Sequence, residues 1–545
     1  MENKHFLVIS MPGQGHINPM FQLGKCLIHA GAGRVTFATT AHGLTQVKAF
    51  PSLENLHYAS FSDGFDDGIK PTNDPHRIMA ELKRVGSQTL TELLLSLSKE
   101  GNPVSYLIYT LLLPWAADVA RDMSIPSVFL CILSTIAFAL CYCFFEERDG
   151  VYDSNDNRSP SSIEMPGLPL FTSKDMPSFL LPNDPHASTL IPLFQHHIQA
   201  LEKDSKPCVL LNTSDCLEEE AIRLISNLNP IPIGPLVSYA FLDENNSTDS
   251  SCGIDLFEKS AEYSQWLNSK PKGSVVYVSF GSLAVLQKNQ MEKILLGLTG
   301  TCRPFLWVIR PSAGSNDREF EEKIRDKVNE EVGLIVPWCS QMEVLTHESI
   351  GCFMMHCGWN STLESLATGV PVLGFPQFSD QTTNAKMVEE VWRTGVRARV
   401  NEDGTLEAEE IERCLEMVMG GGQRGEEIRR NAKKWKGLTL EAVMEGGQKR
   451  KDNSEIDLFC RYPIWLISTI HSKRESRSHA YKQLAGLSYT ICSKWKFIAC
   501  NKRHALNNIN AKYNRRKDKR TADLDLAVDH GKTKVNTTFS DIGIK

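Results

Sequence analysis

The sequence predicts an α/β protein with two similarly built halves, followed by a basic C-terminal tail of irregular composition. In each half, apolar strand-like runs alternate with helix-like segments, which is the pattern of parallel strands covered by helices. A polar, turn-rich stretch at residues 243–252 interrupts this alternation, and the pattern begins again at Ser274. From Gln448 onward the periodicity is lost and positive charge accumulates.

The length and charge of the chain set its domain organisation. A chain of 545 residues is too long for one ordinary core, so two or three domains are expected. We place them at residues 1–240 and 259–447, with a linker at 241–258 and the tail at 448–545. The net charge of −6 argues against nucleic-acid binding by the core. The tail has 21 Lys and Arg against 9 Asp and Glu. We expect it to be mostly disordered, with nucleic-acid binding as the alternative.

Cysteine usage and the N-terminus indicate a reducing compartment. The 15 cysteines are odd in number and irregularly spaced, which does not suit a disulfide framework. The N-terminus enters a strand-like run directly, without the pattern of a signal peptide, so we expect a cytoplasmic protein. Residues 127–145 carry no formal charge and imitate a membrane span. A buried strand followed by an apolar helix is the better interpretation, and no membrane span is expected.

The first half begins with a strand, a glycine-containing loop and a helix. We expect strands at residues 6–11, 34–39, 106–109, 127–133 and 209–212, a loop at 12–16, and helices at 19–30 and from Pro114. The loop contains Gly13 and Gly15, which resembles the start of a dinucleotide-binding fingerprint. Asn18 occupies the third glycine position, so nicotinamide cofactor binding is only weakly indicated.

The second half repeats this order of elements. We expect strands at residues 274–280, 305–309 and 333–336, with a tight turn at Gly281 and Ser282. Helices are expected at residues 287–298, 382–392, 407–419 and 432–444. Between them lies a central window, residues 338–381, which contains a strand, a polar turn, a short helix and a further apolar strand.

The polar turn of the window, residues 356–361, is suited to binding phosphate. A small, polar helix N-terminus after a strand offers unpaired amides and partial positive charge to an anion. Asn360 or Ser361 can cap this helix, and Ser361 with Glu364 matches a capping box. Gly369 is a suitable stop. Glu364 therefore has two interpretations, as a structural cap or as a ligand-binding group.

Histidines and cysteines, which are common metal ligands, are concentrated in this window. The residues concerned are His347, Cys352, His356 and Cys357. Their spacing is not that of a structural zinc site, and both cysteines lie on an expected buried strand. We therefore expect no metal.

The window resembles the signature box of the plant secondary-product UDP-glycosyltransferases. The matching residues are Trp338, Gln341, His347, His356, Cys357, Gly358, Trp359, Asn360, Ser361, Glu364, Gly369, Pro371, Pro376, Asp380 and Gln381. The resemblance extends over roughly residues 5–447. It implies the GT-B architecture, in which an N-terminal acceptor-binding and a C-terminal UDP-sugar-binding Rossmann-like domain face each other across a cleft.

The resemblance also implies roles for the residues of the window. Trp338 would stack on the uracil, and Gln341 and Glu364 would bind the ribose. His356, Gly358, Asn360 and Ser361 would hold the phosphates, with Ser282 from the other turn. Trp359, Asp380 and Gln381 would contact the sugar. A terminal Gln in this box is associated with glucose, so the expected co-substrate is UDP-glucose. We expect no further cofactor, and we expect the enzyme to be a monomer.

His16 matches the catalytic histidine of the family. A histidine can take a proton from an acceptor hydroxyl near neutral pH, after which the oxygen attacks the anomeric carbon with inversion. Many relatives have an aspartate that orients this histidine, whereas the matching position here is Thr110. The surrounding segment, residues 109–115, is similar to a branch with crocetin glucosyltransferases, anthocyanin 5-O-glucosyltransferases and hormone-ester glucosyltransferases. A carboxylic acid acceptor would suit Thr110, because it is already ionised and needs little base catalysis.

The acceptor is expected to be a small lipophilic plant metabolite, such as an apocarotenoid, a flavonoid or a hormone acid. Its pocket is expected to use Thr110 and the apolar segments 129–145 and 176–194. The alternative is a catalytically impaired UDP-sugar-binding homologue. Two departures from the family motivate it: Thr110, and a tail that shows no helix returning to the N-terminal domain.

Overall fold

The computed structural model describes residues 4–445 except 48–49, 71–73, 147–161, 183, 205–206, 239–255, 258 and 312–314. These residues belong to one compact unit, Met1–Ser468. The predicted tail and, apart from residues 256–257, the predicted linker lie outside the described residues. The domain boundaries given above therefore stay predictions.

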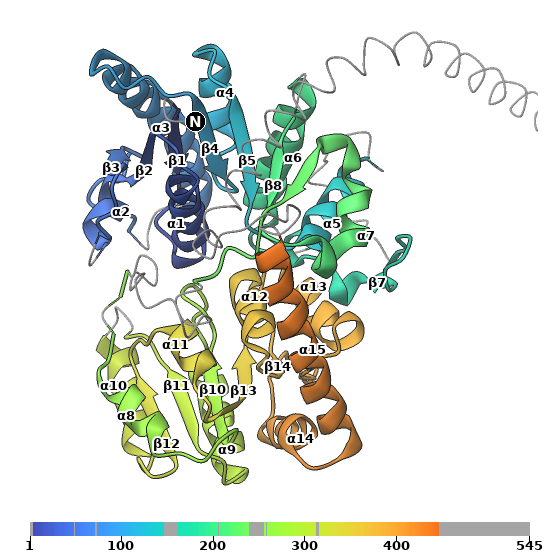
Figure 1. Ribbon diagram of the computed structural model, residues 1–545. Helices are drawn as coiled ribbons and strands as arrows, with labels where there is room; N and C mark the ends of the chain where they lie inside the picture. The colour runs from blue at the N-terminus through green and yellow to red at the C-terminus, as the bar shows by residue number, and fades with distance from the viewer. Residues whose placement is uncertain are drawn as a thin grey trace, which may run out of the picture. The chain divides into compact units, whose positions relative to one another are not determined.

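The first half is built on a parallel seven-stranded sheet with the order β3-β2-β1-β4-β5-β8-β9 (Figure 1). The strands are β1 (His5–Ile9), β2 (Arg34–Thr40), β3 (Leu56–Phe61), β4 (Tyr106–Thr110), β5 (Ser127–Cys131), β8 (Val209–Leu211) and β9 (Pro230–Pro232). All five residues of β1 and of β4 are buried, which explains why these runs are apolar without alternation. A small hairpin joins β6 (Ser162–Ile163) and β7 (Phe171–Thr172).

The second half is built on a parallel six-stranded sheet with the order β12-β11-β10-β13-β14-β15. The strands are β10 (Val275–Ser279), β11 (Phe305–Val308), β12 (Gly333–Val336), β13 (Ile350–Met355), β14 (Val372–Gly374) and β15 (Gly395–Arg397). Because β13 lies between β10 and β14, the loops that follow these three strands meet at one edge of the sheet.

Along the chain, helices connect the strands, as expected for an α/β protein (Figure 1). In the first half they are α1 (Gln14–His29), α2 (Ala41–Gln46), α3 (Pro75–Lys99), α4 (Trp115–Asp122), α5 (Thr135–Glu146), α6 (Ala187–Lys203) and α7 (Asp215–Leu224). In the second half they are α8 (Glu262–Asn268), α9 (Lys288–Gly300), α10 (Ser315–Asp326), α11 (Gln341–Thr346), α12 (Trp359–Thr368), α13 (Gln381–Lys386), α14 (Ala408–Met419) and α15 (Gln423–Glu445). Single 3₁₀ turns occur at Ser173–Asp175, Ser178–Leu180 and Ser226–Leu228, and a π-helix, Met387–Val391, extends α13.

The apolar stretch 127–145 forms strand β5 and helix α5, as the sequence predicted. In the described part of the chain, no helix is both long enough and apolar enough to span a bilayer. Two helices differ from the prediction. Helix α1 begins five residues earlier than expected and takes in part of the predicted loop, and α15 begins nine residues earlier than expected.

The N-terminus of α12 corrects the predicted capping box. The helix begins at Trp359 with Gly358 as its N-cap, and no side chain caps it. Glu364 therefore lies in the second turn, too far along the helix to bond back to the cap. Gly369 ends the helix as predicted, in the left-handed conformation with φ of 73° that glycine adopts at low cost.

Several contacts join the two halves directly. Helix α15 lies against α7, where the Cys216 thiol is 3.7 Å from the Leu438 carbonyl oxygen. The indole of Trp392, which precedes β15, donates to the Leu217 carbonyl at 3.4 Å. Helix α15, which includes the helix predicted at residues 432–444, thus packs on the N-terminal half. The predicted lack of a returning helix after Gly447 concerns residues outside the described part of the chain.

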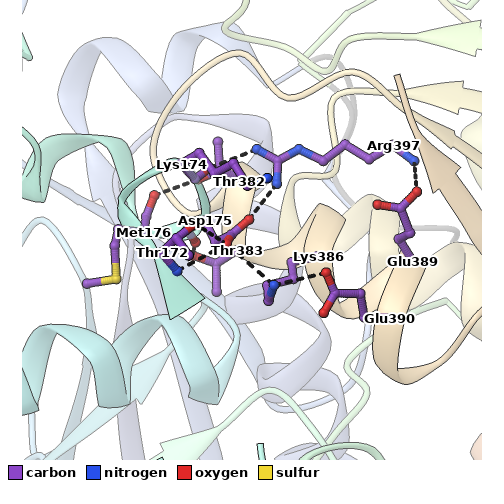
Figure 2. A network of polar contacts seen from close by, with 10 residues as sticks. All are labelled: Thr172, Lys174, Asp175, Met176, Thr382, Thr383, Lys386, Glu389, Glu390 and Arg397. Atoms are coloured by element: carbon purple, nitrogen blue, oxygen red, sulfur yellow. Dashed lines mark hydrogen bonds and ion pairs between the residues drawn. The ribbon is translucent and has the colours of Figure 1, made fainter. Parts of the chain in front are cut away.

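An ion cluster around Asp175 is a second connection between the halves (Figure 2). The Asp175 carboxylate, only 1% exposed, lies 2.8 Å from the Arg397 guanidinium and 3.4 Å from the Lys386 ammonium. Burial pushes the pKa of Asp175 upward. The Thr172 hydrogen bonds and the two cations outweigh this effect, so the pKa lies below its ordinary value.

We expect Asp175→Asn to lower the free energy of unfolding by about 2 kcal/mol, because it leaves the partly buried Arg397 without its carboxylate and Lys386 with Glu390 alone. Since folding lowers the pKa of Asp175, its contribution is complete above the unfolded-state pKa of about 4. It is lost as pH falls through the lower folded-state pKa. Denaturant titrations at pH 7, 4 and 3 measure this, and the gap between wild type and variant should narrow at the acid end.

Asp122→Asn is the matched control, because Asp122 is exposed at the end of α4. Its stability should equal that of the wild type at each pH. A gap for Asp175→Asn that widens on acidification would contradict the assignment.

Candidate active site

Residues of both halves line one cavity at the carboxyl ends of the strands. The first half contributes the start of α1, the residue after β4 and the residues after β5. The second half contributes the turns after β10, β12, β13 and β14. All of the predicted site residues except Thr110 line it: His16, Ser282, Trp338, Gln341, His356, Gly358, Trp359, Asn360, Ser361, Glu364, Asp380 and Gln381.

The N-terminus of α12 opens onto this cavity. The first amides of the helix have no side-chain cap, and residues 358–361 all line the wall. The described wall contains neither Lys nor Arg. An anion bound there would be held by backbone amides, the helix dipole and neutral donors.

His356 is held at this helix N-terminus by two glycines. A Cβ atom added to Gly281 would lie 2.6 Å from the His356 Nε2 atom, and one added to Gly358 would lie 2.5 Å from it. Only glycine fits beside the ring at both positions, and Gly281 also has a positive φ of 76°. Burial lowers the pKa of His356 to about 4, so the ring is neutral at pH 7. Its buried Nδ1 has no hydrogen-bond partner in the described chain.

Gln341 joins two of the predicted ribose and phosphate ligands. Its amide Nε2 donates to the Ser361 hydroxyl at 2.8 Å and to the Glu364 carboxylate at 2.5 Å. Its Oε1 accepts from the Tyr277 hydroxyl at 3.2 Å. Burial raises the pKa of Glu364 to about 7, an effect that the Gln341 hydrogen bond partly offsets. This pair offers a carboxylate and an amide to neighbouring hydroxyl groups of a ligand.

Trp338 presents a flat apolar surface next to this pair. It follows β12, and its ring lies 4.5 Å, centroid to centroid, from the ring of Phe257. Its indole Nε1 is buried and has no partner among the described residues. An aromatic plane of this kind is suited to stacking on a planar base.

Asp380 and Gln381, the N-cap and first residue of α13, are both held by hydrogen bonds. The Asp380 carboxylate accepts from the Asn384 amide at 2.9 Å, and burial raises its pKa to about 6. The Gln381 Oε1 accepts from the backbone amides of Gln377 and Phe378 at 2.8 and 3.1 Å. Its Nε2 is therefore the part of the side chain that can donate to a ligand.

Trp359, a predicted sugar contact, also joins the two halves. Its side chain is 3% exposed, and its indole N–H donates to the Asn212 carbonyl of the first half at 2.9 Å. The indole nitrogen is thus used in a contact between the halves. Trp359 also lines the cavity.

His16 lies in the first turn of α1, three residues before Pro19. Because Pro19 has no amide hydrogen, the Gly15 carbonyl loses its usual partner four residues along the helix. The Asn360 amide of the second half donates to that carbonyl instead, at 2.9 Å. Burial lowers the pKa of His16 to about 4, and its Nδ1 has no partner in the described chain. The imidazole is therefore neutral at pH 7 and able to accept a proton.

Thr110 is fully buried at the end of β4, and its hydroxyl has no partner among the described residues. It does not line the cavity, whereas Leu111 does. The Leu111 carbonyl in turn bonds to the ring of His197, a buried histidine on α6. At this position of the chain, the cavity lining is thus formed by Leu111 and not by Thr110.

The apolar wall differs in other ways from the expectation. Of segment 129–145 only Ile132 and Leu133 line the cavity, and none of the described residues of segment 176–194 does so. Residues 176 and 178 of that segment instead bond to the second half. Residues 236–238, which follow β9, also line the wall and were not among the predicted site residues. They belong to no sequence motif that could have identified them.

Metal ligands are not gathered in the described chain, where no group of three or more His, Cys, Asp and Glu side chains is arranged to hold an ion. His347 bonds to the Ser349 hydroxyl at 2.8 Å and to the Asn268 side-chain oxygen at 3.1 Å. Cys352 is fully buried in β13.

Comparisons with known proteins agree with this geometry. Residues 249–434 match the family model described as UDP-glucoronosyl and UDP-glucosyl transferase. The chain is 47% identical over 466 residues to phloretin 4'-O-glucosyltransferase of Malus domestica, covering 83% of this chain and 97% of the relative. It is 48% identical over 457 residues to the chloroplastic crocetin glucosyltransferase of Gardenia jasminoides, covering 83% and 96%.

A solved structure shares the fold. Os79 from O. sativa, in complex with UDP, superposes with a TM-score of 0.69 at 32% identity, covering 81% of this chain and 96% of that one. The two α/β halves are thus those of a GT-B glycosyltransferase, as predicted. The chain belongs to the plant family 1 UDP-glycosyltransferases, enzymes that transfer a hexose from a UDP-sugar to small plant metabolites.

Proposed function

We propose that this protein is a UDP-glucose-dependent, inverting glucosyltransferase that acts on a hydroxyl or carboxyl group of a small, largely apolar acceptor. One observation carries the proposal. A single cavity brings a neutral histidine on α1 together with an uncapped helix N-terminus and a Gln–Glu pair suited to a ribose. UDP-glucose serves as co-substrate, and no other cofactor is needed.

The nucleotide is proposed to lie along the second half. Its uracil stacks on Trp338, and its ribose hydroxyls bond to Gln341 and Glu364. The diphosphate lies at the N-terminus of α12, held by the backbone from Gly358, the side chains of Asn360 and Ser361, and Ser282. Neutral His356 adds a donor. These contacts replace the cations that the described wall lacks.

The sugar is proposed to lie between the turn before α13 and His16. The Asp380 carboxylate accepts from sugar hydroxyls, and the Gln381 amide donates to one. At the reacting centre, the His16 imidazole takes the proton of the acceptor hydroxyl. The acceptor oxygen forms a bond to C1 as the bond between C1 and the phosphate oxygen breaks. UDP leaves with the bonding electrons, and the configuration at C1 inverts.

The acceptor is proposed to rest on the apolar wall formed by Leu111, Ile132, Leu133 and Leu236. The relatives named above are a phloretin and a crocetin glucosyltransferase, so a phenolic and a carboxylic acceptor are both reasonable first substrates. His16 without a described carboxylate partner favours a carboxylic acid, which needs less base catalysis.

The same unpaired histidine motivates the alternative function, a UDP-sugar-binding homologue with impaired catalysis. Release of UDP from UDP-glucose, measured with phloretin and with crocetin, separates the two. Turnover of either acceptor supports the proposal, and the product's anomeric configuration tests inversion. Saturable UDP binding without turnover of a broad acceptor panel would support the alternative. A monomeric state and a cytoplasmic location stay predictions of the sequence.

We expect His16→Ala to lower kcat with a phenolic acceptor by about 10²- to 10⁴-fold while UDP affinity is unchanged. With a carboxylic acceptor the loss should be smaller, because the nucleophile is already ionised. Steady-state kinetics with both acceptors and UDP titration calorimetry measure this. His29→Ala, an exposed histidine on the same helix, is the control. Equal losses for the two acceptor classes would contradict the role of ionisation.

We expect the affinity for UDP to rise by about tenfold between pH 6 and pH 8 through Glu364 alone. The carboxyl of the free protein has its pKa raised to about 7, and ribose hydroxyls prefer the ionised form. Binding therefore releases a proton and strengthens until Glu364 is ionised. Glu364→Gln should bind UDP more weakly and lose this component.

Titration calorimetry measures the UDP affinity of wild type and of Glu364→Gln at several pH values. The ratio of the two affinities at each pH does not depend on the titration of UDP itself, because that contribution is common to both proteins. Glu348→Gln, an exposed acid of the same half, should follow the wild type. The same pH slope for Glu364→Gln and wild type would show that Glu364 does not contact the ribose.

A further inference from the structure

The turn that carries the proposed sugar ligands has an unfavourable backbone conformation. Ser379, immediately before Asp380, has a positive φ of 63°. A residue with a Cβ rarely adopts this left-handed conformation unless its surroundings hold it there. Asp380 follows Ser379, and Gln381 comes next. The direction in which these two side chains face therefore depends on the backbone conformation of Ser379.

Ser178 of the first half holds both backbone polar groups of Ser379. The Ser178 amide donates to the Ser379 carbonyl at 2.8 Å. In return, the Ser379 amide donates to the Ser178 hydroxyl at 3.0 Å. The two residues are 201 positions apart in sequence. Because both bonds involve one partner residue, Ser178 fixes the orientation of the Ser379 peptide groups.

The segment around Ser178 is itself fixed to the second half (Figure 2). The Thr383 hydroxyl donates to the Asp175 carbonyl at 2.7 Å, and the Thr382 hydroxyl donates to the Met176 carbonyl at 2.6 Å. The Asp175 carboxylate binds Arg397 at 2.8 Å. Ser178 therefore reaches Ser379 from a segment that is already attached to α13, the helix that begins at Gln381.

We infer that Ser178, a residue of the acceptor-binding half, is a positioning residue for the donor sugar. It holds the Ser379 turn in the conformation that directs Asp380 and Gln381 into the cavity. Ser178 does not line the cavity, so it acts through Ser379 and not by contact with the ligand. The inference rests on the proposed function, in which Asp380 and Gln381 bind the sugar of UDP-glucose.

The inference predicts a selective defect. We expect Ser178→Ala to raise the KM for UDP-glucose by roughly 3- to 10-fold, the effect of losing one neutral hydrogen bond. The affinity for UDP should stay within about twofold of wild type, because UDP has no sugar to contact this turn. Ser178→Thr keeps the hydroxyl and should restore most of the affinity. Ser173→Ala, an exposed serine of the neighbouring 3₁₀ turn, is the matched control.

A second variant tests the mechanism. Glycine adopts a positive φ without the cost that serine has, so the Ser379 turn depends less on Ser178 in a Ser379→Gly background. Because Ser379→Gly also removes the hydroxyl that bonds to the Asp380 carboxylate, the double variant is compared with Ser379→Gly alone. We expect Ser178→Ala to raise the KM less in that background than in the wild type. An equal rise in both backgrounds would show that Ser178 does not act through the Ser379 conformation. Equal weakening of UDP and UDP-glucose by Ser178→Ala would indicate general loosening of the contact and would overturn the inference.

Asp380→Asn separates the inference from the proposed function. If Asp380→Asn leaves the KM for UDP-glucose unchanged, the proposed sugar role of the turn is wrong. If Asp380→Asn raises that KM and Ser178→Ala does not, the sugar role stands and the inference about Ser178 fails. A rise in both, with UDP affinity preserved, supports both.

Discussion

The hydrogen bond from Asn360 to the Gly15 carbonyl is the contact on which the geometry of the cavity depends. It is available because Pro19 lacks an amide hydrogen and leaves that carbonyl without its usual intrahelical partner. Asn360 is the second residue of α12, and His16 is the residue after Gly15. This bond therefore directly connects the turn of the proposed base to the helix N-terminus that would hold the leaving group.

Burial, not fixed positive charge, sets the electrostatics of this cavity. The described wall has no Lys or Arg, and burial lowers the pKa of both His16 and His356 to about 4. Burial also raises the pKa of Glu364 to about 7 and that of Asp380 to about 6. Neutral histidines at pH 7 leave the oriented amides of α12 as the main source of positive potential for a diphosphate. The pKa values of the two carboxyl groups thus lie near pH 7, where hydrogen bonds from ligand hydroxyls can favour the ionised form.

The two halves are linked by more than a covalent connection. Trp359 bonds to Asn212, Ser178 to Ser379, and Asp175 to the cations of the second half. The first two contacts each have one partner in the signature window, and the third reaches Lys386 and Arg397 beyond it. The turns that are proposed to bind the donor are thus supported by residues of the half that is proposed to bind the acceptor. On the proposed function, Asp175 and Ser178 therefore bear on donor recognition as well as on stability.

The sequence by itself determined the alternating strands and helices, because strand periodicity and glycine stops are local patterns. The signature window is also local, and its resemblance to a known family implied the family and the GT-B architecture. The sequence also selected twelve of the residues that line the cavity, since most belong to loops after neighbouring strands. The tertiary structure decided what local pattern does not encode: the Gly358 cap in place of a capping box, Leu111 in place of Thr110, and the indole of Trp359 turned to Asn212. It also brought Ser178 to Ser379, because contacts between residues so far apart depend on how the two sheets pack, not on spacing along the chain.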